Sequence, residues 1–156
     1  MKFAGLPIVG IIVATVCYYF LEFAWYGFLF QDAWQAGSGV TPEQYAGQSG
    51  GWMALGVVAP LVQVIAIGLI LKWNGWPSMG EALRKVLCMA LLIGIGVGLY
   101  ALVYLPQHSL ALFLIDTVHY VIGWLLAAFI LTHLRPRYIA PVKARSDKEN
   151  IEDIYP

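Results

Sequence analysis

Apolar side chains fill four long stretches of this chain, and polar or glycine-rich segments separate them. The stretches cover about residues 5–30, 52–73, 82–105 and 110–134. A helix needs roughly 20 apolar residues to cross the hydrocarbon core of a bilayer, and each stretch is about that long. Lipid offers backbone amides no hydrogen-bonding partner, and the stretches are too long for barrel strands. The pattern therefore predicts an all-α fold, a bundle of four transmembrane helices.

Short signals between the stretches predict where the helices begin and end. Thr41–Gln44 (T-P-E-Q) and Ser78–Glu81 (S-M-G-E) have the spacing of capping boxes, in which each of two side chains accepts from the other residue's backbone N–H. Pro106 is expected to end the third helix, and Ser109 to cap the fourth. Pro60 removes a backbone hydrogen bond inside the second helix and is expected to kink it.

The basic residues all fall on one side of the predicted bundle. They lie before the first helix, around the connection between the second and third, or after the fourth, whereas residues 31–51 and 106–109 contain no Lys or Arg. The positive-inside rule then places both termini in the cytoplasm. Residues 1–134 are predicted to form the membrane domain, and residues 135–156 a flexible cytoplasmic tail.

Composition also indicates a membrane protein. Of the 156 residues, 60% are hydrophobic and only 12% are charged, and the mean hydropathy is +0.74. Soluble domains carry about 25% charged residues, so the deficit is typical of a surface that faces lipid. The length leaves no room for a separate soluble catalytic unit. The two cysteines, Cys17 and Cys88, have neither a metal-binding nor a disulfide spacing.

Four polar side chains interrupt the apolar stretches, namely Glu22, Gln63, Asp116 and His119. A helical rise of about 1.5 Å per residue places all four roughly 10–16 Å below the outer surface. A charged group at mid-membrane costs roughly 2.5–3.5 kcal/mol even on lenient scales. We therefore expect these groups to face inward in one layer, with Glu22 and Asp116 sharing His119.

Three interpretations of this layer remain open. Buried polar groups can act as interhelical glue, worth about 0.6 kcal/mol each. They can also form a proton- or ligand-handling site. Glu22, Asp116 and His119 are weak candidates for metal ligands, because D-x-x-H on one helix is an unspecific signal. We predict no metal and no cofactor, and a bound lipid or apolar ligand remains an alternative.

Small and aromatic residues complete the predicted surface of each helix. Gly94 and Gly98 on the third helix, like Gly123 and Ala127 on the fourth, are four residues apart and allow close helix packing. Self-association is the alternative use of these faces. Aromatic residues near the helix ends are expected to form an interfacial belt. They are Tyr26, Trp34, Trp52, Trp73, Trp76, Tyr100 and Tyr104.

The segment LEFAWYGFLFQDAWQAGSGVTPEQ, residues 21–44, resembles the signature of a family of small bacterial membrane proteins known as domain of unknown function 1761. The matching positions are Trp25, Tyr26, Leu29, Phe30, Trp34, Gly39, Thr41 and Glu43. Gly27 and Phe28 replace the family's usual Ser-Pro, so the local turn is expected to differ. The resemblance extends over residues 1–134 and implies a four-helix membrane fold, but no reaction and no catalytic residues.

We therefore expect a non-enzymatic accessory or interaction protein of the bacterial inner membrane. Its expected partners are lipids, other membrane subunits or a second copy, and no nucleic acid. The alternative is a small transporter or membrane enzyme that handles protons or an apolar ligand through Glu22, Asp116, His119 and Gln63. An ionisable residue inside the membrane makes this alternative a reasonable default.

Overall fold

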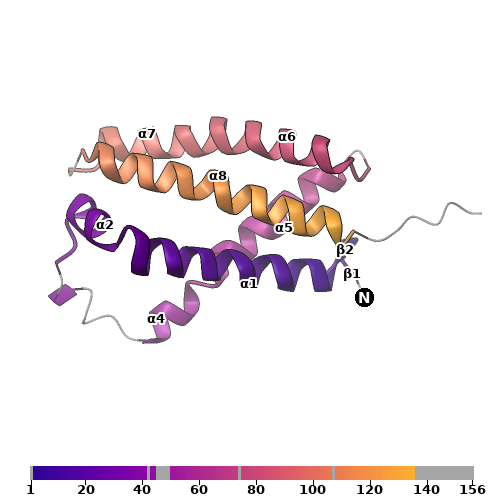
Figure 1. Ribbon diagram of the computed structural model, residues 1–156, viewed down its shortest axis with the longest axis horizontal. Helices are drawn as coiled ribbons and strands as arrows, with labels where there is room; N and C mark the ends of the chain where they lie inside the picture. Colours follow the sequence, from indigo (N-terminus) through magenta and orange to yellow (C-terminus); the bar gives the residue numbers. More distant parts are fainter. Residues whose placement is uncertain (1, 42, 45–49, 74, 107, 136–156) are drawn as a thin grey trace, which may run out of the picture.

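The computed structural model describes residues 2–41, 43–44, 50–73, 75–106 and 108–135 (Figure 1). The regular secondary structure of the described part is helical except for one pair of two-residue strands. The all-α prediction is therefore confirmed for these residues. The predicted tail after residue 135 lies outside them.

Three long helices, among the described residues, are apolar enough to cross a membrane. They contain 22, 26 and 24 residues. The last of them, α8, contacts both of the others, and the three lie side by side (Figure 1). Their elements are α1 (Ile8–Ala24) with the π-helical turn η1 (Trp25–Leu29), α6 (Met79–Met89) with the π-helical turn η2 (Ala90–Gly94) and α7 (Ile95–Tyr104), and α8 (Leu110–His133).

The second predicted helix is broken in two. It consists of α4 (Gly50–Leu55) and α5 (Val58–Lys72), which runs obliquely across the other helices (Figure 1). The ring of a proline clashes with the carbonyl four residues earlier, and for Pro60 that residue is Gly56 in the gap. The prediction of one continuous helix over residues 52–73 is therefore wrong. The disturbance expected from Pro60 is present, but as a break rather than a kink.

The first helix begins three residues later than predicted, because a β-hairpin precedes it. Strand β1 (Lys2–Phe3) pairs antiparallel with β2 (Leu6–Pro7). The two turn residues, Ala4 and Gly5, have φ angles of 48° and 80°. Two consecutive positive φ angles are what the tight type I′ hairpin turn requires. Lys72 secures the turn, since its Nζ donates a hydrogen bond of 2.6 Å to the carbonyl of Ala4.

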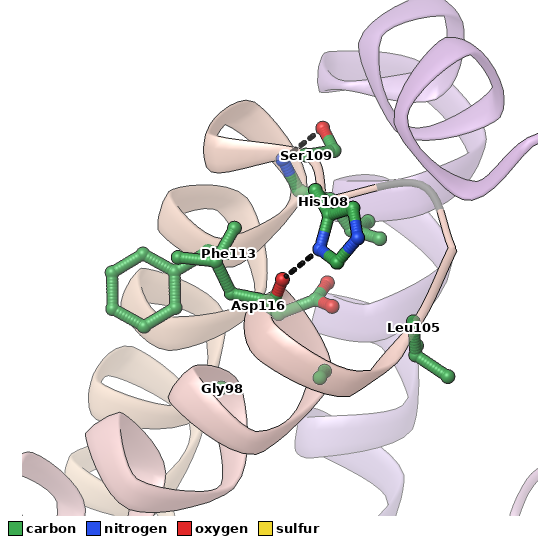
Figure 2. A pocket seen from close by; sticks show the side chains of 9 residues that line it. Gly98, Leu105, His108, Ser109, Phe113 and Asp116 are labelled. Atoms are coloured by element: carbon green, nitrogen blue, oxygen red, sulfur yellow. Dashed lines mark hydrogen bonds between the residues drawn. The ribbon is translucent and has the colours of Figure 1, made fainter.

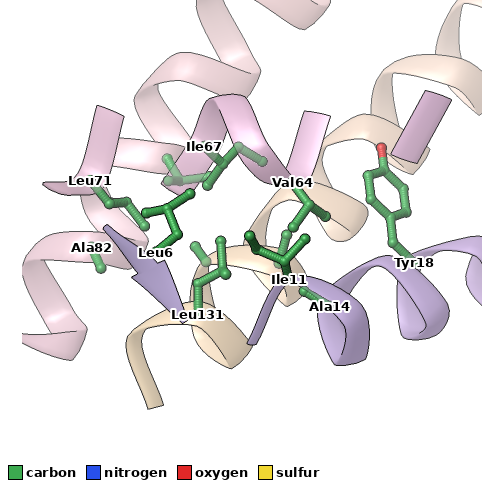
Figure 3. Packing of buried hydrophobic residues seen from close by; sticks show 12 residues of the cluster. Leu6, Ile11, Ala14, Tyr18, Val64, Ile67, Leu71, Ala82 and Leu131 are labelled. Carbon is green, nitrogen blue, oxygen red and sulfur yellow. The ribbon is translucent and has the colours of Figure 1, made fainter. Parts of the chain in front are cut away.

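The hairpin closes the apolar core at one end of the bundle. Leu6 is completely buried, and Figure 3 shows it pointing toward Ile67 and Leu71 of α5. Gly68 makes this contact possible, because a Cβ there would lie 2.8 Å from a methyl group of Leu6. The core contains Leu6, Ile11, Ala14, Tyr18, Val64, Ile67, Leu71, Ala82, Val86, Ala127, Ala128 and Leu131.

The predicted helix-start signals are confirmed. Ser78 and Glu81 form a complete capping box at the start of α6, and the Ser109 hydroxyl accepts from a backbone N–H in the first turn of α8. The amide of Thr41 donates to the Gln44 side chain at 2.9 Å, and the amide of Gln44 donates to the Thr41 hydroxyl at 3.3 Å.

Charge and hydrophobicity are distributed as a membrane protein requires. The hairpin, the start of α6 and the end of α8 lie at one end of the bundle, and α2 (Gln31–Ser38) lies at the other (Figure 1). The described basic residues therefore share the hairpin end, where the Arg135 guanidinium also donates to the Pro77 carbonyl. Large apolar side chains cover the outside, such as Tyr104 at 70% exposure. An apolar surface this extensive is typical of contact with lipid.

The buried position of Leu6 leads to a first prediction. Leu6→Ala should lower the free energy of unfolding by about 2–5 kcal/mol, because it leaves a cavity between the helices. Phe3→Ala is the matched control on the same hairpin, since Phe3 is 54% exposed, and it should change stability by no more than about 0.5 kcal/mol. Reversible unfolding in mixed micelles measures both. Equal losses for the two variants would contradict the proposed closure of the core.

Candidate functional site

One amide oxygen joins three helices in the interior. Oε1 of Gln63, on α5, accepts a hydrogen bond of 3.0 Å from the Tyr18 hydroxyl of α1. It also accepts one of 2.5 Å from the indole Nε1 of Trp124 on α8. Polar contacts therefore join the first, second and fourth predicted helices, but the partners of Gln63 are Tyr18 and Trp124 rather than Glu22, Asp116 or His119.

A second set of contacts joins the end of the first helix to α8. The Tyr26 hydroxyl donates to Oδ1 of Asp116 at 2.9 Å, and Trp25 Nε1 donates to the carbonyl of Ile115 at 3.3 Å. Both aromatic residues belong to the π-helical turn η1, which is closed by a bond from the Phe30 amide to the Trp25 carbonyl. Single π-helical turns often occur at functional sites. The turn at Gly27 and Phe28 is thus π-helical.

His119 lies at the centre of four aromatic rings. The imidazole is 2% exposed, and its centroid lies 4.9 Å from the ring of Tyr26, 5.5 Å from Tyr18 and 5.9 Å from both Trp25 and Tyr120. We call these four rings the aromatic box. Neither ring nitrogen of His119 has a hydrogen-bond partner in the described part of the chain. A buried polar group without a partner costs about 1–3 kcal/mol, which weak N–H contacts to ring faces offset only in part.

Glu22 lies beside the aromatic box without joining it. Its side chain is partly buried and lies one helical turn after Tyr18 on α1. Since the nitrogens of His119 are unpaired and Asp116 bonds to Tyr26, the expectation that the two acids share His119 is wrong.

The structure provides no metal centre within its described residues. No group of three or more His, Cys, Asp or Glu side chains there is arranged to hold an ion. The weak candidates Glu22, Asp116 and His119 are therefore not gathered as a ligand set.

A small cavity connects Asp116 to the end of the bundle opposite the hairpin. It lies between α7 and α8, has a volume of about 20 Å³ and is lined in part by Asp116, His108 and Ser109 (Figure 2). This is roughly the space that one water molecule occupies. His108 has a φ of 43°, and its Nδ1 lies 2.8 Å from the carbonyl of Leu102. The ring thus covers the cavity from the loop between α7 and α8.

The small residues selected from the sequence lie where neighbouring elements approach closely. A Cβ on Gly123 would lie 2.1 Å from the ring of Tyr18, so the ring can pack there only because position 123 has no side chain. A Cβ on Gly98 would lie 2.8 Å from the ring of Phe113. Gly94 lies in ordinary contact range of Tyr120. Ala127 is completely buried in the core.

The sequence does not identify Tyr18 and Tyr26 as the hydrogen-bond partners of Gln63 and Asp116. Tyr26 was expected in the interfacial belt, yet its hydroxyl bonds to Asp116. The useful signal was spacing, because Tyr18, Glu22 and Tyr26 are four residues apart and share one face of a helix. That face already carried an acid that had to point inward.

The long apolar helices, the apolar outer surface and the inner polar layer together define a membrane protein. The chain belongs to the family described as Protein of unknown function (DUF1761), whose sequence profile matches residues 9–132. The match begins after the hairpin and extends nearly to the end of α8. Two of the signature positions, Trp25 and Tyr26, form part of the aromatic box. No curated protein and no solved structure matches the chain.

The contact between Gly123 and Tyr18 leads to a second prediction. Gly123→Ala should lower the free energy of unfolding by about 1–3 kcal/mol, because the new methyl group displaces the ring that bonds to Gln63. Gly96→Ala is the control, since a Cβ at Gly96 meets nothing within 4 Å. This control should be neutral or should stabilise by up to about 1 kcal/mol through helix propensity. If the two variants have the same free energy of unfolding, the position of the Tyr18 ring does not depend on the absence of a side chain at Gly123.

Proposed function

We propose that this chain is a non-enzymatic protein of the bacterial inner membrane that packs against lipids or partner membrane subunits. The observation that carries the proposal is the use of its inner polar groups. Tyr18 and Trp124 bond to Gln63, and Tyr26 bonds to Asp116, so these groups connect helices to one another. Such contacts stabilise a bundle without requiring a substrate.

The outer surface supports the same proposal. On α7, the side chains of Val97, Tyr100, Val103 and Tyr104 are 54%, 65%, 57% and 70% exposed. This face is suited to acyl chains or to an apolar helix of another subunit.

We further propose that the chain crosses the membrane four times, with both ends in the cytoplasm. The chain leaves α2 at the end opposite the hairpin and enters α6 at the hairpin end, so the segment between them must traverse the bundle. The broken pair α4 and α5 occupies this path. The grouping of basic residues at the hairpin end favours that end as the cytoplasmic one.

Cysteine labelling tests this orientation as a third prediction. In a background with Cys17 and Cys88 replaced by alanine, Ala36→Cys in α2 should react with a membrane-impermeant maleimide in intact spheroplasts. Gly80→Cys, near the start of α6, should react only after permeabilisation, because it is expected to face the cytoplasm. Both positions are exposed on the protein surface, so burial does not explain a difference. The reverse pattern would overturn the orientation.

A second candidate function is proton handling, and one observation favours it. Asp116 lines the water-sized cavity near the outer end of the bundle, while its other contact, Tyr26, belongs to the aromatic box around His119. A proton path would need donors and acceptors on both sides of that box. The unpaired nitrogens of His119 interrupt such a chain in the described residues.

Reconstitution distinguishes the two candidate functions in a fourth prediction. Liposomes containing the protein should dissipate an imposed pH gradient no faster than empty liposomes. His119→Phe should leave the free energy of unfolding within about 1 kcal/mol of the parent or raise it, since an apolar ring replaces an unpartnered imidazole. A proton flux above that of empty liposomes, lost in both Asp116→Asn and His119→Phe, would replace the packing function with proton handling.

A further inference from the structure

A groove in the side of the bundle opens toward the lipid-facing surface. It lies between α5, the junction of η2 with α7, and α8, and its volume is about 190 Å³. Two residues at its edge, Ile93 and Val97, are 50% and 54% exposed on the outer face. The residues that line it are Gln63, Ile93, Gly94, Val97, Tyr120 and Trp124.

Among the residues that line this groove, Gln63 carries a side-chain amide, beside the hydroxyl of Tyr120 and the indole of Trp124. The amide oxygen is occupied by the hydroxyl of Tyr18 and the indole of Trp124. Two donors on one oxygen identify that atom as the carbonyl oxygen, so the other atom of the amide must be the NH₂ group, which can only donate. Among the described residues, no acceptor is bound to this NH₂ group, and the hydrocarbon region has no water to supply one.

We propose that this groove binds a lipid-soluble molecule with a single-ring head that carries a carbonyl group and with an apolar tail, as in a benzoquinone. The carbonyl of the head accepts a hydrogen bond from the NH₂ group of Gln63. The tail leaves the groove past Val97 and continues among the acyl chains. The inference rests on the membrane placement proposed above, but not on the absence of proton transport.

The size and the walls of the groove determine the class of ligand. A cavity of about 150 Å³ holds one benzene molecule, so a groove of the present size holds one substituted six-membered ring. The rings of Tyr120 and Trp124, with centroids 6.3 Å apart and planes at 55°, form its aromatic wall. Gly94 contributes no side chain and leaves the floor open. A plain acyl chain would fill the space but would leave the Gln63 amide without an acceptor.

Equilibrium binding of radiolabelled decylubiquinone to the protein in nanodiscs, corrected for empty nanodiscs, tests the proposal. We expect saturable binding at one site per chain. Decylbenzene, which has a ring and a tail but no carbonyl, should bind at least tenfold more weakly to the unaltered protein. Equal affinities of the two probes would overturn recognition through the carbonyl, and non-saturable uptake of decylubiquinone would overturn the site itself.

A pair of variants on α7 locates the site. Val97→Phe fills the groove without touching the polar contacts of Gln63, and it should weaken decylubiquinone binding at least tenfold. Val103→Phe is the matched control, because Val103 is equally exposed at 57% but does not line the groove. It should bind like the parent. Undiminished binding in Val97→Phe would place the ligand elsewhere. The cysteine-labelling result does not depend on ligand binding. The two experiments therefore distinguish the absence of a ligand site from an incorrect membrane orientation.

Discussion

The carbonyl oxygen of Gln63 is the point at which three helices of this bundle are held in register. In hydrocarbon, a buried acceptor or donor finds no water, so each one must be paired within the protein. Tyr18 of α1 and Trp124 of α8 meet this requirement by donating to the same atom. Much else depends on this arrangement. The ring of Tyr18 can pack here because Gly123 has no side chain, and Gln63 also lines the lateral groove.

In the aromatic box, a buried polar group is surrounded by rings instead of being paired through hydrogen bonds. His119 is buried without a hydrogen bond in the described residues, so its environment is apolar although its side chain is not. The imidazole packs against the rings of Tyr18, Trp25 and Tyr26 and forms no hydrogen bond with either acid. Stability here comes from aromatic packing, worth about 0.5–1.5 kcal/mol per ring pair, rather than from charge pairing.

Features that depend on a few neighbouring residues could be predicted from the sequence. Three long apolar helices and the capping boxes at Ser78 and Thr41 are of this kind, because hydropathy and local hydrogen bonds determine them. The break at Gly56 was predictable, because a proline ring clashes with the carbonyl four residues earlier in a helix. The aromatic partners of His119 could not be predicted from the sequence. Helical spacing identifies the face of a helix on which a residue lies, but it does not show which side chains of the facing helix will contact that residue.

The hairpin at the start of the chain has a consequence for the order of assembly. Leu6 is synthesised well before Leu131 near the end of α8, yet both residues belong to the same buried core. Domains assemble from the N-terminus as synthesis proceeds, and contacts distant in sequence form late. The hairpin therefore reaches its complete packing only after α8 is in place. Packing of the hairpin against the helices is the step that completes the core.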